Sequence, residues 1–208
     1  MQLIVSGTGT EVGKTVVSCA LARALAKRGP TKGIKPYETG VIERAHDAEM
    51  LAQAAGQPCV HPYFRAAAPL APAAFDEVPT ISTIAEQIRD ELTRCEHAVV
   101  ESAGGLFVPI ASGQLFADLA VKLGLPIVLV TYDGLGTLSH TLATLEAARS
   151  YSLPIQAIVL NQGLPGDASR EFNLKILAEH SDVPIVVVSH ESEGHIDERA
   201  EEILALIA

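Results

Sequence analysis

Short apolar runs that alternate with helix-like segments constrain the fold of this chain more than any other feature. Five of them are nearly continuous in Val, Ile and Leu, and a sixth is weaker: Leu3–Ser6, Ala98–Glu101, Ile127–Thr131, Ala157–Asn161, Ile185–Ser189 and, weaker, Thr31–Lys35. Continuous apolar runs are typical of strands that are covered on both faces, as in parallel sheets. The sequence therefore predicts an α/β fold with a mainly parallel sheet.

Segments with helical character lie between these runs and after the last one. They are Lys14–Lys27, Asp47–Ala55, Ile81–Cys95, Phe116–Leu123, Leu138–Tyr151, Ser169–His180 and Ile196–Ile207. Gly29, Gly56 and Gly124 follow three of them, and glycine commonly terminates a helix. Pro58–Pro79 has no clear periodicity, so we expect an ordered, irregular loop over one end of the sheet. At 208 residues, we expect a single domain, residues 1–208, with helices on both faces of the sheet.

Composition excludes several classes of protein. Hydrophobic residues make up 48% of the chain and charged residues 19%, which excludes a disordered protein. The net charge of −10 and the lack of a dense Lys/Arg run disfavour nucleic acid as a partner. No apolar run approaches the roughly 20 residues of a membrane span, and the first residues do not resemble a signal peptide. Three widely spaced cysteines, Cys19, Cys59 and Cys95, argue against a disulfide framework, so we expect a cytoplasmic protein with no membrane partner.

A glycine-rich segment between the first strand and the first helix is the strongest indication of a ligand. It reads Gly7-Thr8-Gly9-Thr10-Glu11-Val12-Gly13-Lys14-Thr15 and continues into the helix at Val16. Small residues allow backbone N–H groups to surround phosphate oxygens, and the helix N-terminus adds its positive end. Lys14 supplies a charge to the terminal phosphates, and the Thr15 hydroxyl suits Mg²⁺. Five residues separate the first glycine from the Gly-Lys pair instead of the usual four, so the segment is a variant phosphate loop.

Polar or charged residues also end three other predicted strands. Ligands of open parallel sheets bind beyond the carboxyl ends of the strands. At such a strand end, Lys35 is either a second amine that stabilises charge on a transferred phosphoryl group or a surface lysine. Glu101 is either the acidic Mg²⁺ partner of a phosphate-loop enzyme or an ordinary strand-end carboxylate. The amide of Asn161 either contacts a nucleobase or forms a turn.

The remaining candidates have less specific chemistry. Asp47 opens a predicted helix, as either a Mg²⁺ ligand or an N-cap. Thr39 lies in a turn that ends in glycine, which is enough to explain a short polar side chain. Glu11 is unusual in a phosphate loop, because phosphates repel a carboxylate; it is either a solvated charge of the loop or it faces a cation or an amine. The segment Gly134–His140 leads into a helix whose free N–H groups form an anion site for a substrate carboxylate.

Taken together, these motifs resemble those of the dethiobiotin synthetase family. The matching pieces are Gly7–Thr15, Lys35-Pro36 with Thr39-Gly40, Asp47-Ala48, Glu101 with Ala103-Gly104-Gly105, and Gly134–Leu138 with His140. They occur in the family's order, and the long spacing in the phosphate loop is normal for that family. The resemblance runs from Gly7 to about Asn161. The chain departs from the family at Ser102, where Gly is usual, and at Ser139, where Asn is usual.

The resemblance implies a phosphate-loop α/β fold and an enzyme of biotin synthesis. Such an enzyme makes dethiobiotin, ADP and phosphate from 7,8-diaminopelargonate, CO₂ (or bicarbonate) and ATP. One amine of the substrate takes up CO₂ as a carbamate, the carbamate attacks the γ-phosphate, and the second amine closes the ureido ring. The resemblance also implies ATP and Mg²⁺ as cofactors and a homodimer with substrate near the subunit interface.

The resemblance further implies roles for individual residues. The catalytic residues are Lys14 and Lys35, and the Mg²⁺ ligands are Thr15, Asp47 and Glu101. The nucleotide-binding residues are Gly9, Thr10, Glu11, Val12, Gly13, Lys14, Thr15, Val16 and Asn161. The substrate contacts are Thr10, Glu11, Lys35 and Thr39, with Leu135, Gly136, Thr137 and Leu138 reaching in from the partner chain.

Two other functions use the same nucleotide-binding core. Another phosphate-loop ligase, such as a cobyrinate-type amide synthase, normally carries a glutaminase domain, for which 208 residues leave no room. A switch ATPase of the MinD/ParA type usually has an additional lysine near the start of the loop, where this chain has Gly7-Thr8-Gly9. We also expect no basic, membrane-binding helix at the C-terminus. The order of the motifs favours the synthetase.

Overall fold

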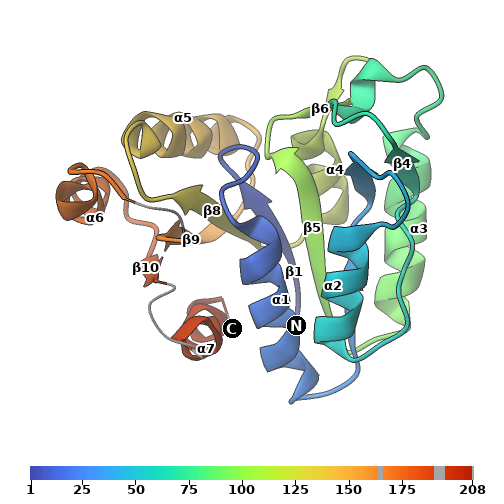
Figure 1. Ribbon diagram of the computed structural model, residues 1–208, viewed down its shortest axis with the longest axis horizontal. Helices are drawn as coiled ribbons and strands as arrows, with labels where there is room; N and C mark the ends of the chain where they lie inside the picture. The colour runs from blue at the N-terminus through green and yellow to red at the C-terminus, as the bar shows by residue number, and fades with distance from the viewer. Residues whose placement is uncertain (164–165, 190–194, 208) are drawn as a thin grey trace.

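Parallel strands form the central sheet of the computed structural model, which describes residues 1–163, 166–189 and 195–207. These strands are β1 (Gln2–Gly7), β2 (Thr31–Ile34), β5 (His97–Gly105), β8 (Ile127–Tyr132), β9 (Ile155–Asn161) and β10 (Ile185–Val188). Their order across the sheet is β10-β9-β8-β1-β5-β2 (Figure 1), and all neighbours run parallel. The predicted α/β fold with a parallel sheet is confirmed, and the weak run at Thr31–Lys35 forms the edge strand β2.

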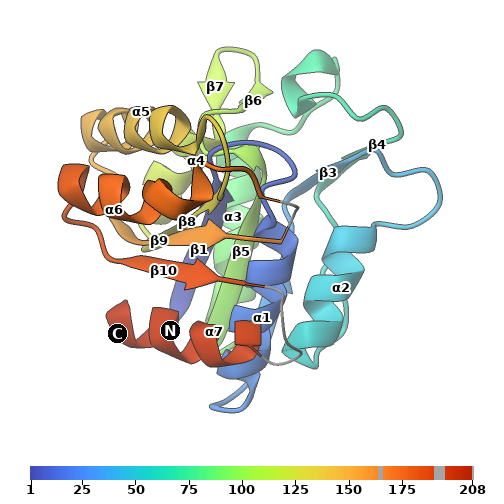
Figure 2. The same cartoon turned by 60° about the vertical axis from the view of Figure 1, so that its left-hand side comes forward.

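Helices cover both faces of this sheet. They are α1 (Lys14–Ala26), α2 (His46–Ala55), α3 (Ile81–Thr93), α4 (Phe116–Leu123), α5 (Thr137–Ser150), α6 (Arg170–His180) and α7 (His195–Leu206). The core on one face includes α1, α2 and α7, and the core on the other face includes α3, α4 and α5. Helix α6 lies beside α5 (Figures 1 and 2). Every expected helix is confirmed to within two residues at each end.

Strand β1 shows why continuous apolar runs mark a doubly covered sheet. Successive side chains of a strand point to opposite faces. Leu3 and Val5 accordingly pack in the core that contains α1, whereas Ile4 packs in the core on the other face. All three side chains are completely buried.

Two of the three expected glycine stops lie at helix ends. Gly56 and Gly124 follow α2 and α4 directly with φ of +66° and +64°, the left-handed backbone that favours glycine. Gly29 lies farther on, because α1 already ends at its C-cap residue Lys27. In the described parts of the chain, no helix is both long and apolar enough to cross a membrane.

The segment Pro58–Pro79 is mostly irregular, as expected, but it contains two short elements that its sequence did not indicate. Strand β4 (Phe64–Ala66) pairs in parallel with β3 (Tyr37–Thr39), and Pro72–Ala74 form one turn of 3₁₀-helix. A second small pairing joins β6 (Pro109–Ala111) to β7 (Gln114–Leu115). Strands of two or three residues are too short to show a period, so sequence patterns miss them.

Helix α1 stabilises the fold through apolar burial, which a leucine truncation tests. Leu21 is completely buried, so we expect Leu21→Ala to lower the free energy of unfolding by about 3 kcal/mol. Leu174 on α6 is 41% exposed, so Leu174→Ala is the matched control, with an expected loss below about 1 kcal/mol. Urea unfolding measures both. Equal losses in the two variants would contradict the packing of α1 against the sheet.

Candidate functional site

The glycine-rich loop connects the carboxyl end of β1 to the first turn of α1 (Figure 1). Backbone hydrogen bonds fix its start, because Thr8 N donates to Val130 O at 3.0 Å and Leu106 N donates to Gly7 O at 2.9 Å. Farther along the loop, Glu11 has a positive φ of +57°. Gly13, Lys14 and Thr15, at the start of α1, line the cavity described below, and a helix N-terminus beside a cavity suits an anion.

Gly13 occupies a position that only glycine fits. It is the N-cap residue of α1, with φ +94°. A Cβ atom at this position would lie 2.0 Å from Asn161 Nδ2. The buried amide of Asn161, at the end of β9, donates to Val12 O at 2.9 Å. Asn161 thus fixes the phosphate loop directly, a contact that the sequence did not suggest, and its expected contact with a nucleobase stays a prediction.

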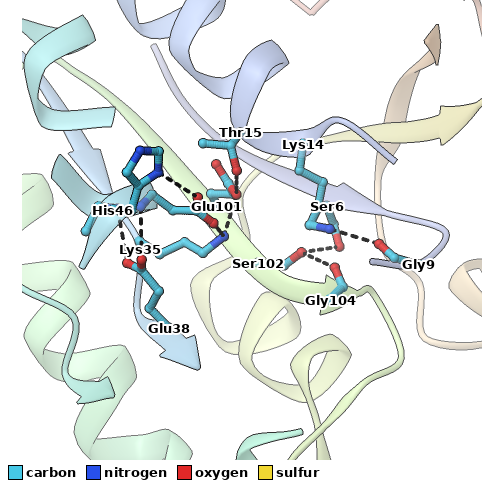
Figure 3. Close-up of polar contacts among 12 residues, drawn as sticks. Ser6, Gly9, Lys14, Thr15, Lys35, Glu38, His46, Glu101, Ser102 and Gly104 are labelled. Atoms are coloured by element: carbon cyan, nitrogen blue, oxygen red, sulfur yellow. Dashed lines mark hydrogen bonds and ion pairs between the residues drawn. The ribbon is translucent and has the colours of Figure 1, made fainter. Parts of the chain in front are cut away.

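The two lysines expected to be catalytic differ in their surroundings. Lys14 Nζ donates to Gly9 O at 2.8 Å within the loop (Figure 3). Burial, together with repulsion from Lys35, lowers the pKa of Lys14 to about 8. Burial also opposes the charge of Lys35, but Glu101 and Asp47 outweigh it and raise the pKa of that amine. The ammonium of Lys35 is therefore held by carboxylates, and it is not the surface lysine of the alternative interpretation.

Glu101 is the completely buried carboxylate at the centre of this arrangement. Its Oε1 accepts a hydrogen bond of 2.7 Å from the Thr15 hydroxyl and another from Lys35 Nζ (Figure 3). Lys35 Nζ also pairs with Asp47 Oδ2 at 3.1 Å. Glu101 does not end its strand as predicted, because β5 continues for four more residues to Gly105. Its carboxylate nevertheless meets the loop threonine, the lysine and Asp47 in one place, as the resemblance implied.

Glu38 is a residue of this site that sequence reasoning missed. Its carboxylate accepts hydrogen bonds from the backbone N–H groups of Asp47 (2.9 Å) and Ala48 (3.1 Å) at the start of α2. Burial raises the pKa of Glu38. Asp47 is therefore not the N-cap, which is Ala45, and that alternative for Asp47 is wrong. Only the proximity of Glu38 to Lys35 and Thr39 in the sequence could have pointed to it.

A cavity of about 680 Å³ lies beside these groups, and we call it the site cavity. The expected site residues that line it are Thr10, Glu11, Gly13, Lys14, Thr15, Val16, Lys35, Thr39, Asp47 and Glu101. Pro69–Pro72 form part of its wall, together with Tyr37 and Glu38. The structure thus brings most of the predicted residues together from four regions of the chain that lie far apart in sequence.

Other expected site residues do not line the site cavity. Gly9 and Val12 contribute backbone carbonyls to the contacts described above. The segment Leu135–Leu138 lies at the start of α5, where Leu135 is 86% exposed and its N–H bonds to Asp167 Oδ2 at 2.8 Å. The hydroxyl of Thr137 is buried against that of Thr131 at 2.8 Å. A role of this segment in a partner's site stays a prediction.

The donors at the site cavity fit a hard divalent cation. Within residues 1–163, 166–189 and 195–207, no group of three or more His, Cys, Asp or Glu side chains could hold a metal ion by itself. However, Glu101 Oε2 is buried without a hydrogen-bond partner among these residues. Thr15 and Asp47 add two further oxygen donors beside it. Mg²⁺ typically takes one or two carboxylates and completes its shell with water and substrate phosphates, so this donor set suits Mg²⁺ with a bound nucleotide.

The two departures from the family pattern have different surroundings. Ser102 is completely buried; its hydroxyl lies 2.9 Å from that of Ser6 and donates to Gly104 O at 3.1 Å. The side chain thus braces the last residues of β5, where Gly104 has φ +62°. Ser139 is exposed on α5.

Known proteins resemble this chain over most of its length. A family model described as an AAA domain matches residues 1–199. An ATP-dependent dethiobiotin synthetase of Anaeromyxobacter dehalogenans (strain 2CP-C) is 44% identical over 175 residues, covering 79% of this chain and 78% of that protein. The synthetase of Parafrankia sp. (strain EAN1pec) is 40% identical, covering 76% and 70%. A biotin biosynthesis bifunctional protein of Bordetella avium (strain 197N) is 40% identical, covering 81% of this chain and 36% of that protein.

Solved structures with the same fold are much more distant in sequence. A plasmid partition protein from Borrelia burgdorferi has a TM-score of 0.67 at 10% identity, covering 99% of this chain and 97% of that one. The septum site-determining protein MinD of Pyrococcus horikoshii, complexed with Mg-ADP, has a TM-score of 0.57 at 17% identity, covering 100% and 99%. At such identities the likeness shows the fold alone.

The close approach of Asn161 to the loop predicts the effect of a single methyl group at Gly13. We expect Gly13→Ala to weaken binding of an ATP analogue at least about tenfold, because the loop must shift where it surrounds phosphate. Gly56→Ala is the matched control, since Gly56 also has a positive φ but nothing lies within 4 Å of an added Cβ. The control isolates the backbone cost, about 1–2 kcal/mol of stability. Calorimetric titration and urea unfolding measure the two effects, and unchanged affinity in Gly13→Ala would contradict the loop geometry.

Proposed function

The chain belongs to the ATP-dependent dethiobiotin synthetase family, and we propose that the site cavity is where it closes the ureido ring of dethiobiotin. The activity is that of an ATP-dependent ligase in biotin biosynthesis. The observation that carries the assignment to this cavity is the meeting of Lys14, Thr15, Lys35, Asp47 and Glu101 along its wall. Such a ligase needs three things in one place: a nucleotide site, a metal ion held by carboxylates, and a second lysine amine to stabilise the transferred phosphoryl group.

The reaction joins the two amines of 7,8-diaminopelargonate through one carbon. The first amine attacks CO₂ and loses a proton, which gives a carbamate. A carbamate oxygen then attacks the γ-phosphorus of ATP, and ADP leaves. The second amine attacks the carbon of this mixed anhydride, phosphate leaves with the C–O bond pair, and loss of a proton completes the cyclic urea.

The phosphate loop supplies the nucleotide side of this reaction. Gly9–Val16 provide backbone N–H groups for the phosphates. Lys14, whose ammonium donates to Gly9 O in this structure, would donate to a phosphate oxygen once a nucleotide is present. A pKa near 8 leaves the Lys14 amine readily protonated beside an anion, since a nearby negative charge favours the charged form. Asn161 holds the loop through its hydrogen bond to Val12 O.

Thr15, Asp47 and Glu101 are the residues that would hold Mg²⁺. When bound, this ion neutralises the β- and γ-phosphate oxygens during phosphoryl transfer. The unpartnered Glu101 Oε2 supports this assignment. The three donors come from α1, α2 and β5, and all three line the site cavity.

The diamine side of the cavity is formed by Thr10, Glu11 and Thr39. Glu11 is exposed at the cavity edge, where a carboxylate gains from a cationic amine and would otherwise repel phosphate. Lys35, which lines the same cavity and pairs with Glu101 and Asp47, would contact the carbamate and the transferred phosphoryl group. Holding the carbamate out of bulk water would protect it from breakdown.

The organisation of the whole protein completes the proposal. We propose a single domain that works as a homodimer in the cytoplasm, with Leu135–Leu138 of each chain binding the substrate carboxylate in the partner's site. The positive φ of Gly136 and the lack of a side-chain cap on α5 among the described residues support an anion contact there. The switch-ATPase alternative shares the fold with the partition proteins, but the relatives that are 40–44% identical are named as biosynthetic proteins.

An assay of ADP release with each substrate omitted in turn tests the function. We expect turnover only when ATP, Mg²⁺, bicarbonate and the diamine are all present, because phosphoryl transfer needs the carbamate as its acceptor. The product is checked by mass spectrometry. ATP turnover that is indifferent to the diamine would exclude the synthetase and favour a switch ATPase.

Substitution of Lys35 separates a role in the transition state from simple nucleotide binding. We expect Lys35→Ala to lower kcat by about 10²- to 10³-fold and to change KM for ATP less than about threefold. Lys32→Ala is the control on the same strand, since Lys32 pairs with Glu91 away from the cavity, and it should keep kcat within about twofold. Steady-state kinetics measures both variants. A Lys35→Ala variant with normal kcat and raised KM would refute the proposed role.

A further inference from the structure

Helix α2 has no cap of its own at the end that carries Asp47. Its N-cap residue is Ala45, which has no side chain able to accept a hydrogen bond. The first N–H groups of a helix have no partner within the helix and need one from elsewhere. Here the partner comes from another element, because Glu38 on β3 accepts from both Asp47 N and Ala48 N, one with each carboxylate oxygen.

Glu38 is well suited to hold this helix end. Its side chain is only 6% exposed, so its two hydrogen bonds form away from competing water. A negative charge at a helix N-terminus is also favourable. Two bonds from one carboxylate to successive N–H groups fix both the position and the rotation of the first turn of α2.

The segment that carries Glu38 holds Asp47 in two ways. Lys35 pairs with the carboxylate of Asp47 at 3.1 Å, while Glu38 binds its backbone N–H at 2.9 Å. Only the contact with Lys35 uses a group that also takes part in the proposed reaction. In the proposed reaction Lys35 contacts the carbamate and the phosphoryl group, so the substrate competes with the Asp47 carboxylate for this amine.

We propose that Glu38 is a positioning residue, which keeps the Asp47 carboxylate at the magnesium site when Lys35 is engaged with substrate. The inference rests on the proposed function for the identity of the metal donors. Glu38 acts through the backbone of Asp47 and does not itself touch the reacting atoms. The partners of ligating carboxylates typically change metal affinity about 10- to 100-fold when removed.

Binding of Mn²⁺ in the presence of ADP tests this inference without any turnover. The paramagnetic resonance signal of free Mn²⁺ reports how much metal the full-length protein binds. We expect Glu38→Ala to raise the apparent dissociation constant for Mn²⁺ about tenfold, with metal-free ADP binding changed less than about twofold. Glu38→Gln should give a smaller loss, because its amide oxygen can still accept one of the two N–H groups. This variant keeps the test valid if Glu38→Ala does not fold.

Two further variants separate positioning from general stabilisation. Glu49→Ala removes a carboxylate from the same first turn of α2, where Glu49 pairs with the exposed Arg44, and Mn²⁺ affinity should stay within about twofold. In an Asp47→Ala background, Glu38→Ala should add less than about twofold to the loss, because it acts through Asp47.

The outcomes distinguish the inference from the function on which it rests. Equal effects of Glu38→Ala in both backgrounds, or none in the wild-type background, would overturn the positioning role and leave the synthetase assignment intact. Unchanged Mn²⁺ affinity in Asp47→Ala alone would overturn both the proposed magnesium ligand and the role of Glu38. Failure of the diamine-dependent assay would instead refute the proposed function, and the Mn²⁺ measurements would still decide whether Glu38 positions Asp47.

Discussion

The paired burial of Glu101 and Lys35 is the interaction on which the rest of the site depends. A carboxylate without solvent is costly unless charge and hydrogen bonds compensate it. Glu101 has that compensation on one oxygen only, from Thr15 and Lys35, while its other oxygen has no partner among the described residues. Glu101 Oε2 therefore remains an unpaired acceptor next to the phosphate loop, and a cation bound with a nucleotide would pair with it.

This half-compensated carboxylate explains why the neighbouring charges are arranged as they are. Lys35 bridges Glu101 and Asp47, so the positive charge of its ammonium offsets the repulsion between the two carboxylates. Lys14 stays apart on a backbone carbonyl of the loop. The two amines thus have different partners, so each is available to a different part of a bound substrate. A site with both lysines on one carboxylate would lack that division.

The sequence indicated most of the sheet and much of the site, for physical reasons that differ. Continuous apolar runs such as that of β1 are specific for doubly covered strands, and polar residues that follow such runs, as Glu101 does, mark the ligand-binding edge even though β5 continues to Gly105. Glu38 escaped notice because its importance comes from a hydrogen bond across space to α2. The short strand β3 that carries it has no period to detect. Contacts between distant segments leave no local pattern in a sequence.

Asn161 illustrates the same limit from the other end of the chain. Its type was suggestive, yet nothing near it in sequence indicates a contact with Val12, 149 positions away. The local residues of the phosphate loop are sufficient to predict a phosphate site, but the group that fixes the loop's second half belongs to β9.

That long separation has a consequence for how the protein is made. Contacts between residues far apart in sequence form late, since a large loop must close first. While the chain is being synthesised, β1 and α1 emerge early, but the amide that supports their connecting loop arrives only after three quarters of the protein. The ability to bind a nucleotide should therefore arise near the end of folding on the ribosome, together with the docking of β9.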